Sequence, residues 1–477
     1  MKRIAIVGGG IAGLTAAYEF EKARLRGADI DWQLYEATDH LGGLVSTTRI
    51  DTPEGRFILE DGPDGWVTEK PWASELAIEL GLADQIIPCN EDRRRTLILI
   101  NGQLQPMPQR MRMMVPEDLT TLEGSTLFSG AARAAYAAEL ANAAALKAAA
   151  PTQDESVASF ALRHFGEEVL NKIGAPLLSG VFGGDVHKLS VRAVMPAFVA
   201  MEQEHGSLIA ALQAKAKERG PRPPQPAFTT LRNGMGSLAE AIVAKLPAER
   251  VHLNRSALSI KRERGMWCLR TSTEVKNGKS KRHFNHIFLA TPADVTRRLL
   301  EPLAPQSTTL IPNHASSAVL VAMAFPAAQA ASIAIPEGFG FLVPRGNTQT
   351  TLLAATFVDQ KYPDRVPSGA RILRAFFSGP AADALSIQPD ATVAAAAHEQ
   401  LSAILGPLPA IAPALTTVRR WPRSLPQYEV NHLDRMAQLD DLITTLGGLA
   451  LLGNAYRGVG VPDLIRDSRA AVRNLLS

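Results

Sequence analysis

The first 35 residues show a strand-like apolar run, then a helical spacing of apolar residues, then a second strand-like run. Residues 2–7 place four consecutive apolar residues after a basic pair, which predicts a buried β-strand. Apolar side chains then recur at helical spacing through Ala16, Ala17 and Phe20, and a second apolar-rich run covers residues 30–35. This order predicts a βαβ unit, whose two strands are parallel because the helix carries the chain back across the sheet.

Farther along the chain, local patterns predict more strands and helices. Asn101-Gly102 between two apolar-rich segments is a strong hairpin signal, and Gly55 marks the turn of another hairpin in residues 52–62. Apolar runs predict strands at residues 251–253, 266–271, 284–292 and 449–452. Helical spacing predicts helices at residues 71–81, 131–150 and 156–173, so residues 106–218 are expected to be mostly helical.

The uncharged residues 316–336 have the length of a membrane span but not its pattern. Large apolar residues alternate with smaller ones from Val319 to Phe325, and Pro326 then interrupts the run. Because this alternation is typical of a strand, we expect a strand of a mixed sheet and not a transmembrane helix. The whole pattern predicts an α/β fold: a Rossmann-like domain, a mixed-sheet domain and an inserted, mainly helical domain.

A glycine-rich turn with the pattern G-x-G-x-x-G follows the first strand. In such a turn the first glycine permits a tight bend, the second lets the backbone approach a pyrophosphate, and the third lets helix and strand pack closely. The start of the following helix faces the phosphates, and an acid at the end of the second strand accepts hydrogen bonds from a ribose. The expected dinucleotide contacts are Gly8, Gly10, Ile11, Ala12, Gly13 and Glu36. The alternative, a glycine-rich turn without a ligand, is disfavoured by the strand–helix–strand context.

Two further glycine-rich turns point to the same ligand. Gly42 and Gly43 follow soon after the ribose acid and imply a second close approach of the backbone. Near the C-terminus, a short apolar strand leads into a glycine-rich turn and then into a helix, whose first-turn amides and dipole favour an anion. The expected contacts there are Gly453, Val459, Gly460 and Val461. Any one of these turns could be a plain loop, but turns at both ends of the chain together favour a ligand.

Composition excludes several other classes of protein. The 50 basic and 47 acidic residues give a net charge of +3, and no long basic tract carries interleaved aromatic residues, so we expect no nucleic acid partner. Cys89 and Cys268 lie far apart and lack metal-ligand spacing, so we expect no metal ion and a reducing compartment. The first strand begins almost at residue 1, which predicts no signal peptide.

Motifs outside the glycine turns carry a more specific resemblance. They are Asp-Gly-Pro-Asp at 61–64, Leu-Ser-Gly-Val-Phe-Gly-Gly-Asp at 178–185, Gly-Phe-Gly-Phe-Leu-Val-Pro at 338–344 and Pro-Gln-Tyr at 426–428. In these motifs the chain resembles the oxygen-dependent protoporphyrinogen IX and coproporphyrinogen III oxidases, which belong to the amine-oxidase-type FAD oxidoreductase superfamily. It departs from that family at Gly65-Trp66, where many members carry a small polar residue and Phe, and at Leu44, where many carry a basic residue.

The resemblance implies a cofactor and a reaction. FAD, bound non-covalently, would remove hydride equivalents from a porphyrinogen substrate, and O2 would reoxidise the flavin with release of peroxide, three times per substrate. Because pyrrole rings are electron-rich, hydride loss depends more on position than on acid–base assistance, so no catalytic base is assigned. His187, His205 and His314 are open alternatives, but a structural or surface role explains them better.

The resemblance also implies further contacts with the two ligands. Gly62, Pro63, Asp64 and Val251 are expected to contact the cofactor. Arg95, or Arg94 in the alternative register, would bind a propionate of the substrate through its forked guanidinium. Phe339 and Phe341 could face the flat macrocycle, although alternating strand residues could equally belong to the core.

Charge favours one of the two porphyrinogens. Residues 173–184 and 316–336 lack charge, and Arg93–Arg95 is the clearest run of cations in the expected substrate segments. Protoporphyrinogen IX has two propionates, whereas coproporphyrinogen III has four and would need several cations around its pocket. The sequence therefore favours protoporphyrinogen IX and leaves coproporphyrinogen III as the alternative.

The resemblance divides the chain into three domains. Residues 1–70, 228–298 and 436–477 are expected to form the FAD-binding domain, residues 71–105 and 299–435 the substrate-binding domain, and residues 106–227 the helical domain. The Pro-rich residues 220–226 are expected to form a stiff connector. We expect a cytoplasmic protein, and a homodimer is an open alternative. The methionine-rich residues 104–115 are expected to line the substrate channel or, as the alternative, to contact the inner face of the cell membrane peripherally.

Two other classes of protein stay open. Another amine-oxidase-type FAD enzyme, acting on an amine or a carotenoid, would share both ends of the chain and differ in the middle. A non-catalytic flavoprotein would share the cofactor contacts, but nothing in the sequence favours it.

Overall fold

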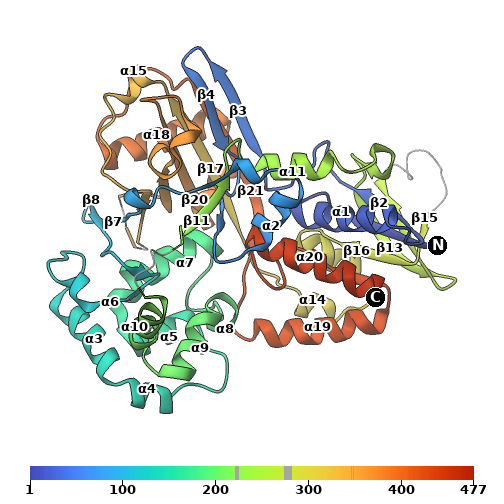
Figure 1. The fold of residues 1–477 in the computed structure, drawn as a ribbon, viewed down its shortest axis with the longest axis horizontal. Helices are drawn as coiled ribbons and strands as arrows, with labels where there is room; N and C mark the ends of the chain where they lie inside the picture. The colour runs from blue at the N-terminus through green and yellow to red at the C-terminus, as the bar shows by residue number, and fades with distance from the viewer. Residues whose placement is uncertain (221–224, 273–281, 345, 348) are drawn as a thin grey trace.

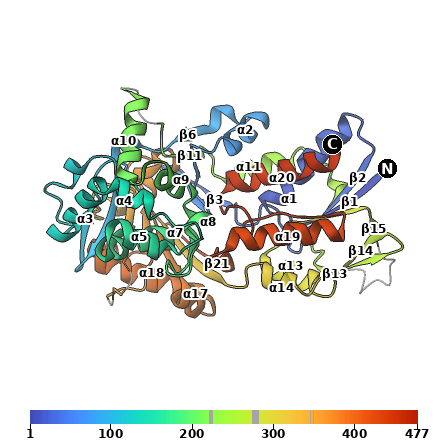
Figure 2. The same ribbon diagram turned by 90° about the horizontal axis from the view of Figure 1, so that it is seen from below.

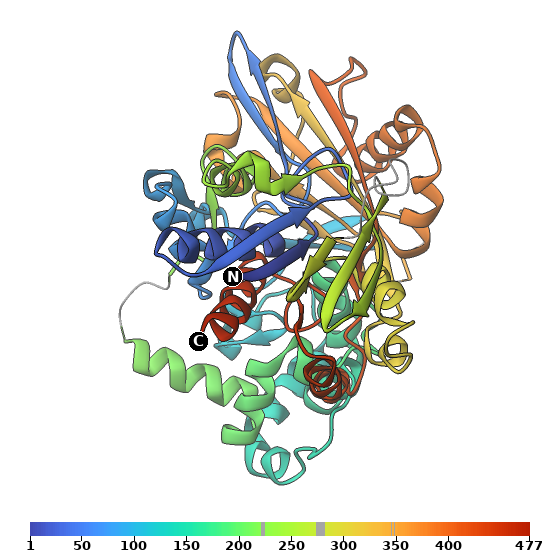
Figure 3. The same cartoon turned by 90° about the vertical axis from the view of Figure 1, so that its right-hand side faces the viewer.

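The computed structural model describes residues 1–220, 225–272, 282–344, 346–347 and 349–477 (Figure 1). Residues 221–224 of the expected connector lie outside the described residues. In Figure 1 a sheet flanked by helices occupies the right of the molecule, a larger sheet the upper left and a group of helices the lower left. The two termini lie close together on one side of the molecule (Figures 1 and 3).

A five-stranded parallel sheet brings together three distant parts of the chain. In order across the sheet, its strands are β12 (Val251–His252), β2 (Ile30–Tyr35), β1 (Lys2–Val7), β16 (His286–Leu289) and β22 (Leu449–Leu451). Every neighbouring pair is parallel. The carboxyl ends of these strands therefore meet at one edge, where ligands bind in open α/β sheets.

Both faces of the parallel sheet are covered. Alternate residues of β1 point to opposite sides of the sheet, and the apolar residues on each side pack in a core. Ile4 and Ile6 pack in one core with α1, α11 and α20, whereas Ala5 and Val7 pack in another with α19 and a small antiparallel sheet. The elements on these faces are α1 (Ile11–Leu25), α2 (Trp72–Glu79), α11 (Gly236–Val243), α13 (Ala293–Leu300), α14 (Ser307–Leu310), α19 (His432–Leu446), α20 (Val461–Leu476), β13 (Ala257–Glu263), β14 (Met266–Thr271) and β15 (Arg282–Phe284). The predicted βαβ unit and the α/β fold class are confirmed.

A seven-stranded mixed sheet forms the second large layer. In order, its strands are β21 (Leu415–Pro426), β17 (Ala315–Phe325), β20 (Arg371–Ser378), β19 (Ala354–Phe357), β18 (Gly340–Leu342), β7 (Thr96–Ile100) and β8 (Gln103–Pro106). The strand predicted near Val319 is β17, and β21 and β20 flank it on both sides. It is uncharged because both of its faces are buried. Among the described residues, no helix is long and apolar enough to cross a membrane.

Short elements connect and cover the mixed sheet. They are β3 (Thr47–Thr52), β4 (Gly55–Glu60), β5 (Trp66–Val67), β6 (Ile86–Pro88), β11 (Phe228–Leu231), α15 (Ala327–Ala330), α16 (Val358–Lys361), α17 (Gly379–Ser386) and α18 (Asp390–Leu405). Single 3-10 turns lie at Ala83–Gln85, Glu91–Arg93, Leu119–Leu122, Ala248–Arg250 and Pro363–Arg365. The two predicted hairpins are confirmed, and Asn101 and Gly102 have the positive φ values that a two-residue turn of this type requires.

The third layer is mainly helical and lies at one end of the molecule (Figure 2). Its elements are β9 (Met111–Arg112), β10 (Val115–Pro116), α3 (Gly130–Ala141), α4 (Ala143–Ala148), α5 (Val157–Phe165), α6 (Glu167–Val169), a π-helical turn (Leu170–Gly174), α7 (Ala175–Phe182), α8 (Val191–Val194), α9 (Pro196–His205) and α10 (Leu208–Arg219).

Two helices of this layer differ from the prediction. The helix predicted at residues 131–150 breaks at Asn142, which has weak helix propensity and ends one helix and begins the next. The helix predicted at residues 156–173 ends at Phe165, because Gly166 adopts a φ of 81° that a helix does not permit.

Candidate cofactor and substrate site

The glycines of the first turn have two different environments: a side chain at Gly8 or Gly13 would clash with the protein, whereas Gly10 faces open space. A Cβ on Gly8 would lie 2.3 Å from the Ala290 carbonyl oxygen, and one on Gly13 would lie 1.9 Å from the Gly8 carbonyl oxygen. A Cβ on Gly10 would meet nothing nearer than the Gly43 Cα, at 4.0 Å. Packing therefore explains the outer glycines, whereas the absence of a side chain at Gly10 leaves room for a ligand.

Helix α1 begins at this turn with Ile11 and Ala12, and its N-cap residue Gly10 offers no side-chain cap. The first intrahelical bond runs from the Leu14 amide to the Gly10 carbonyl oxygen, at 2.9 Å. The backbone amides of residues 11–13 precede this bond and have no partner within the helix, and such amides bind anions at helix N-termini.

Glu36 follows β2 and connects the strand to the glycine turn. One carboxylate oxygen, Oε2, accepts a 2.6 Å hydrogen bond from the Gly9 amide. The other, Oε1, accepts bonds from the Thr38 amide at 2.8 Å and its hydroxyl at 2.9 Å. Because a carboxylate has about four acceptor positions, Glu36 holds the turn and still has capacity for a ribose hydroxyl.

The second glycine turn packs directly on the first. The Gly42 amide donates to the Gly9 carbonyl oxygen at 2.9 Å, and Gly42 pairs with Gly10 in a parallel bridge. A Cβ on Gly43 would lie 3.1 Å from the Gly10 Cα. The two turns thus form one surface of bare backbone around the open space at Gly10.

The C-terminal glycine turn reaches the same edge of the sheet. It follows β22, and the Gly453 Cβ position lies 3.9 Å from the Thr291 carbonyl oxygen, in the loop after β16. Helix α20 then starts at Val461, after Val459 and the N-cap Gly460, again without a side-chain cap. Figures 1 and 2 show α1 and α20 side by side. Two uncapped helix starts and three glycine turns therefore meet where a dinucleotide would lie.

Gly62 and Asp64 lie among protein groups. A Cβ on Gly62 would lie 1.9 Å from the Leu44 carbonyl oxygen, so only glycine fits before Pro63. The Asp64 carboxylate contacts Lys361 Nζ at 2.9 Å and Arg374 at 3.3 Å. Burial alone would raise the pKa of Asp64, but the two cations outweigh burial and lower this pKa to about 2. A cofactor at Asp64 would meet a carboxylate whose charge is already balanced.

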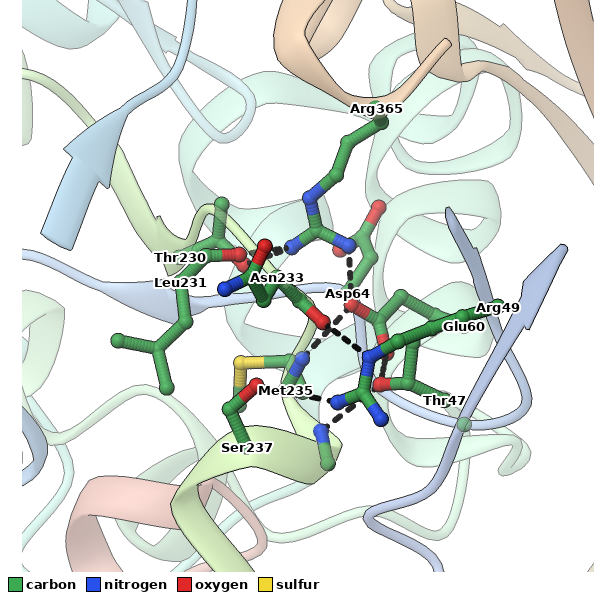
Figure 4. Close-up of polar contacts among 12 residues, drawn as sticks. Thr47, Arg49, Glu60, Asp64, Thr230, Leu231, Asn233, Met235, Ser237 and Arg365 are labelled. Atoms are coloured by element: carbon green, nitrogen blue, oxygen red, sulfur yellow. Dashed lines mark hydrogen bonds and ion pairs between the residues drawn. The ribbon is translucent and has the colours of Figure 1, made fainter. Parts of the chain in front are cut away.

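A buried ion pair next to this segment was not predicted from the sequence (Figure 4). Arg365 pairs with Glu60 and donates to the Thr230 hydroxyl at 2.6 Å and the Leu231 carbonyl oxygen at 2.8 Å. Glu60 also accepts from the Met235 amide at 2.8 Å. The cluster connects β4 to β11 and to the residue that precedes α11. The sequence carried a signal only for the neighbouring pair of Arg374 with Asp64, because an arginine within the apolar run of β20 needs a buried partner.

The expected substrate residues fall into two environments. Arg95 Nη1 contacts Glu337 at 2.9 Å, and the Phe339 amide donates to the Arg95 carbonyl oxygen at 2.8 Å. Arg95 and half-buried Phe339 are therefore neighbours. Phe341 is only 1% exposed and packs near Phe357 in the core, with ring centroids 6.2 Å apart. Of the two alternatives for Phe341, a contact with the macrocycle or a place in the core, this burial favours the core.

The remaining candidates lie outside the glycine turns. Val251 begins β12 at the edge of the parallel sheet, beside Leu34. His314 is exposed and pairs with Glu429 at 2.8 Å, and His205 lies 3.6 Å from Glu204. Each of these two histidines therefore contacts a glutamate outside the glycine turns.

A cluster of metal-ligand types lies on the small antiparallel sheet. One donor atom each from Glu263, Cys268 and His283 lies within 4.8 Å of the others. Glu263 Oε2 lies 3.5 Å from His283 Nε2, and Lys261 lies opposite Cys268 in the strand ladder. Because Glu263 and His283 already contact each other and Lys261 lies on the paired strand beside Cys268, we assign no metal ion to this cluster.

The parallel sheet and the three glycine turns at its carboxyl edge are typical of oxidoreductases that bind FAD. The model of the family described as flavin containing amine oxidoreductase matches residues 11–476, and the chain belongs to this family. FAD is its cofactor, and the open space at Gly10 and the uncapped starts of α1 and α20 fit its pyrophosphate and flavin.

Relatives match over the full length of the chain. It is 29% identical to coproporphyrinogen III oxidase of Bacillus subtilis (strain 168), over 100% of this chain and 98% of the relative. It is 30% identical to coproporphyrinogen III oxidase of Propionibacterium freudenreichii subsp. freudenreichii, over 98% of this chain and 89% of the relative. A crystal structure of a protein from Exiguobacterium sp. 255-15, provisionally assigned as a protoporphyrinogen oxidase, superposes with a TM-score of 0.85 at 30% identity, covering 100% of this chain and 98% of that one.

Proposed function

We propose that this protein uses FAD to oxidise a porphyrinogen to the porphyrin. The full-length similarity to proteins named as porphyrinogen oxidases carries the proposal, since it extends through all three layers and beyond the cofactor turns. Six hydrogen atoms leave the substrate as three hydrides and three protons, and bound FAD would supply the acceptor for each hydride. The protein supplies position, because the electron-rich pyrroles favour hydride loss and ring nitrogens release their protons to water.

Molecular oxygen is the proposed electron acceptor. Three O2 molecules accept the three electron pairs with their protons and leave as three molecules of peroxide, so atoms and electrons balance. The flavin is proposed to be bound non-covalently, since no cysteine lies near Tyr456 in the C-terminal turn. Acid precipitation should leave the flavin in the supernatant; flavin that stays with the precipitated protein would contradict this.

Coproporphyrinogen III is the first candidate substrate, because both relatives named above carry that name. The charge argument for protoporphyrinogen IX is weakened in one respect: β17, one of its two uncharged segments, is a core strand. It is supported in another, since each arginine of residues 93–95 already pairs with Glu91 or Glu337. These pairs leave less positive charge for four propionates, so protoporphyrinogen IX is the second candidate.

Anaerobic bleaching of the flavin tests the function directly. Oxygen-free protein is mixed with coproporphyrinogen III, with protoporphyrinogen IX, or with a primary amine as the control for the amine-oxidase alternative. Bleaching by a porphyrinogen, followed by peroxide release when O2 is admitted, supports the proposal. Bleaching by the amine alone, or by none of the three, contradicts it. A tenfold difference in kcat/KM assigns the preferred porphyrinogen.

Peripheral membrane contact is a further proposal for residues 104–115. Arg110 is exposed and Arg112 contacts Glu69 at 2.9 Å, whereas Met114 is buried in the core of the helical layer. The cations, and not the buried methionine, would then contact anionic lipid. Sedimentation with anionic liposomes at low salt tests this, and protein that stays wholly in the supernatant would refute it.

A homodimer stays a prediction, to be checked by the mass of the protein in solution.

A further inference from the structure

The C-terminal glycine turn is held by two stacked aromatic rings that no sequence motif assigned to the cofactor. Tyr428 lies just after β21, and His432 begins α19. Their rings are stacked with centroids 3.9 Å apart and an interplanar angle of 10°. Tyr428 is 2% exposed and His432 is fully buried, so both rings are part of the protein interior.

Tyr428 bonds to two backbone groups of the turn through one hydroxyl. The hydroxyl donates to the Asn454 carbonyl oxygen at 2.7 Å and accepts from the Gly458 amide at 3.0 Å. These two groups lie on either side of the bend between β22 and α20. One side chain therefore fixes the orientation of two peptide units in the segment that precedes the uncapped helix start.

His432 fixes a third peptide unit between them. Its Nε2 lies 2.8 Å from the Tyr456 carbonyl oxygen, and because a carbonyl only accepts, Nε2 must carry the proton. Nδ1 is buried without a hydrogen-bond partner among the described residues. Burial lowers the pKa of His432 to about 4, so the ring is neutral and keeps this tautomer at neutral pH.

The segment that carries the two rings is itself fixed from the opposite side. The Ser190 amide donates to the Tyr428 carbonyl oxygen at 2.7 Å, and the Val430 amide donates to the Lys188 carbonyl oxygen at 2.8 Å. The Gln427 side-chain amide donates to the Phe182 carbonyl oxygen at 2.9 Å. The helical layer, the end of β21 and the glycine turn therefore meet at this segment, which makes it a rigid support for the turn.

We propose that Tyr428 and His432 are positioning residues for the flavin: they hold the peptide units of residues 454–458 in the orientation that lets the turn and the start of α20 receive the cofactor. Neither side chain needs to touch the flavin, since both act through the backbone of the turn. The proposal rests on FAD binding at the site described above and does not depend on which substrate the enzyme oxidises.

The test compares FAD affinity in variants that keep or remove these hydrogen bonds. Tyr428→Phe keeps the ring and the stack but loses both bonds, and should raise the Kd for FAD roughly tenfold. It should also alter the fine structure of the flavin visible band and shift the midpoint potential to more negative values, because the amides at the turn no longer stabilise reduced flavin. Tyr136→Phe is the matched control, since Tyr136 is equally buried and donates to the Met114 carbonyl oxygen at 2.9 Å in the helical layer.

A second pair of variants keeps the proposal testable if Tyr428→Phe does not fold. His432→Gln can place its amide nitrogen near the position of Nε2 and should bind FAD about as wild type, whereas His432→Leu should bind it roughly tenfold more weakly. The proposal is overturned if Tyr428→Phe and His432→Leu bind FAD like wild type, or if Tyr136→Phe weakens binding as much as they do. Because these measurements use no porphyrinogen, a failure of flavin bleaching would leave them unaffected.

Discussion

At the scale of single residues, the glycines of the first turn serve two different purposes that a pair of substitutions separates. Gly10 has an ordinary φ of −71°, and a Cβ there meets open space. Gly10→Ala should therefore leave the melting temperature of the apoprotein unchanged and raise the Kd for FAD at least about tenfold, because the methyl group would fill the space in which we expect the pyrophosphate. Flavin fluorescence and thermal melts give the two readouts.

Gly13→Ala is the contrasting variant. Its Cβ would lie 1.9 Å from a backbone oxygen, so the helix and strand must separate and the apoprotein itself should melt at a lower temperature. If Gly10→Ala binds FAD as tightly as wild type, the cofactor does not lie over Gly10.

The predicted contact of Arg95 with a substrate propionate can be tested by substitution. Arg95→Ala should raise KM about tenfold with an unchanged flavin spectrum, because a charge-assisted hydrogen bond is worth roughly 1.5–3 kcal/mol. Glu337→Gln should have the opposite effect and lower KM, since it releases Arg95 from its 2.9 Å contact. Arg94→Ala is the matched control, with its own partner Glu91 at 2.6 Å. An unchanged KM in Arg95→Ala and a raised KM in Arg94→Ala would move the role to Arg94.

At the scale of elements, a buried histidine holds the helices of the third layer together. His164 on α5 lies 3.1 Å from Glu139 on α3 through Nδ1, and 3.1 Å from Glu202 on α9 through Nε2. Burial disfavours the charged imidazolium, but the two carboxylates outweigh burial and raise the pKa of His164. The same contact, with help from Arg163, lowers the pKa of Glu202.

The raised pKa of His164 predicts how stability depends on pH. Its stabilising contribution is fully present below the unfolded value of about 6.5 and is lost as pH rises through the raised folded value. The melting temperature of wild type should therefore fall between neutral and alkaline pH more steeply than that of His164→Gln, which carries no titrating group. Parallel curves for the two proteins would show that His164 does not gain its proton on folding.

At the scale of the whole molecule, the buried pair of Arg365 and Glu60 connects segments that are far apart in the chain. Arg365→Leu leaves the Glu60 carboxylate without its cation, and breaking a buried pair in this way costs about 3–5 kcal/mol. Arg232→Ala is the control. Arg232 pairs with Asp364, the residue before Arg365, but both side chains of this pair are about half exposed. Removing this pair should cost at most about 1 kcal/mol. Urea denaturation compares the two, and equal losses would mean that the buried pair does not hold the layers together.

Much of the local structure and of the cofactor turns could be predicted from the sequence. The strands at residues 2–7 and 30–35 have their predicted bounds, because short apolar runs and glycine turns depend on neighbours in the chain. The helix breaks at Asn142 and Gly166 were missed, since a strong helical pattern on both sides conceals a single residue that ends the helix.

The sequence by itself determined the βαβ unit, the glycine turns and the family, since each of these is a pattern of consecutive residues. Only the tertiary structure decided which side chains face a ligand and which face the core. Phe341 is buried because α17 and α18, which follow later in the chain, contribute side chains to the core on its face of the mixed sheet. No pattern of consecutive residues specifies which face of β18 those helices cover. The pair of Arg365 with Glu60 and the contacts of Tyr428 with the C-terminal turn follow the same rule: they join segments that meet only after the layers have packed, so their partners are set by the fold and not by spacing along the chain.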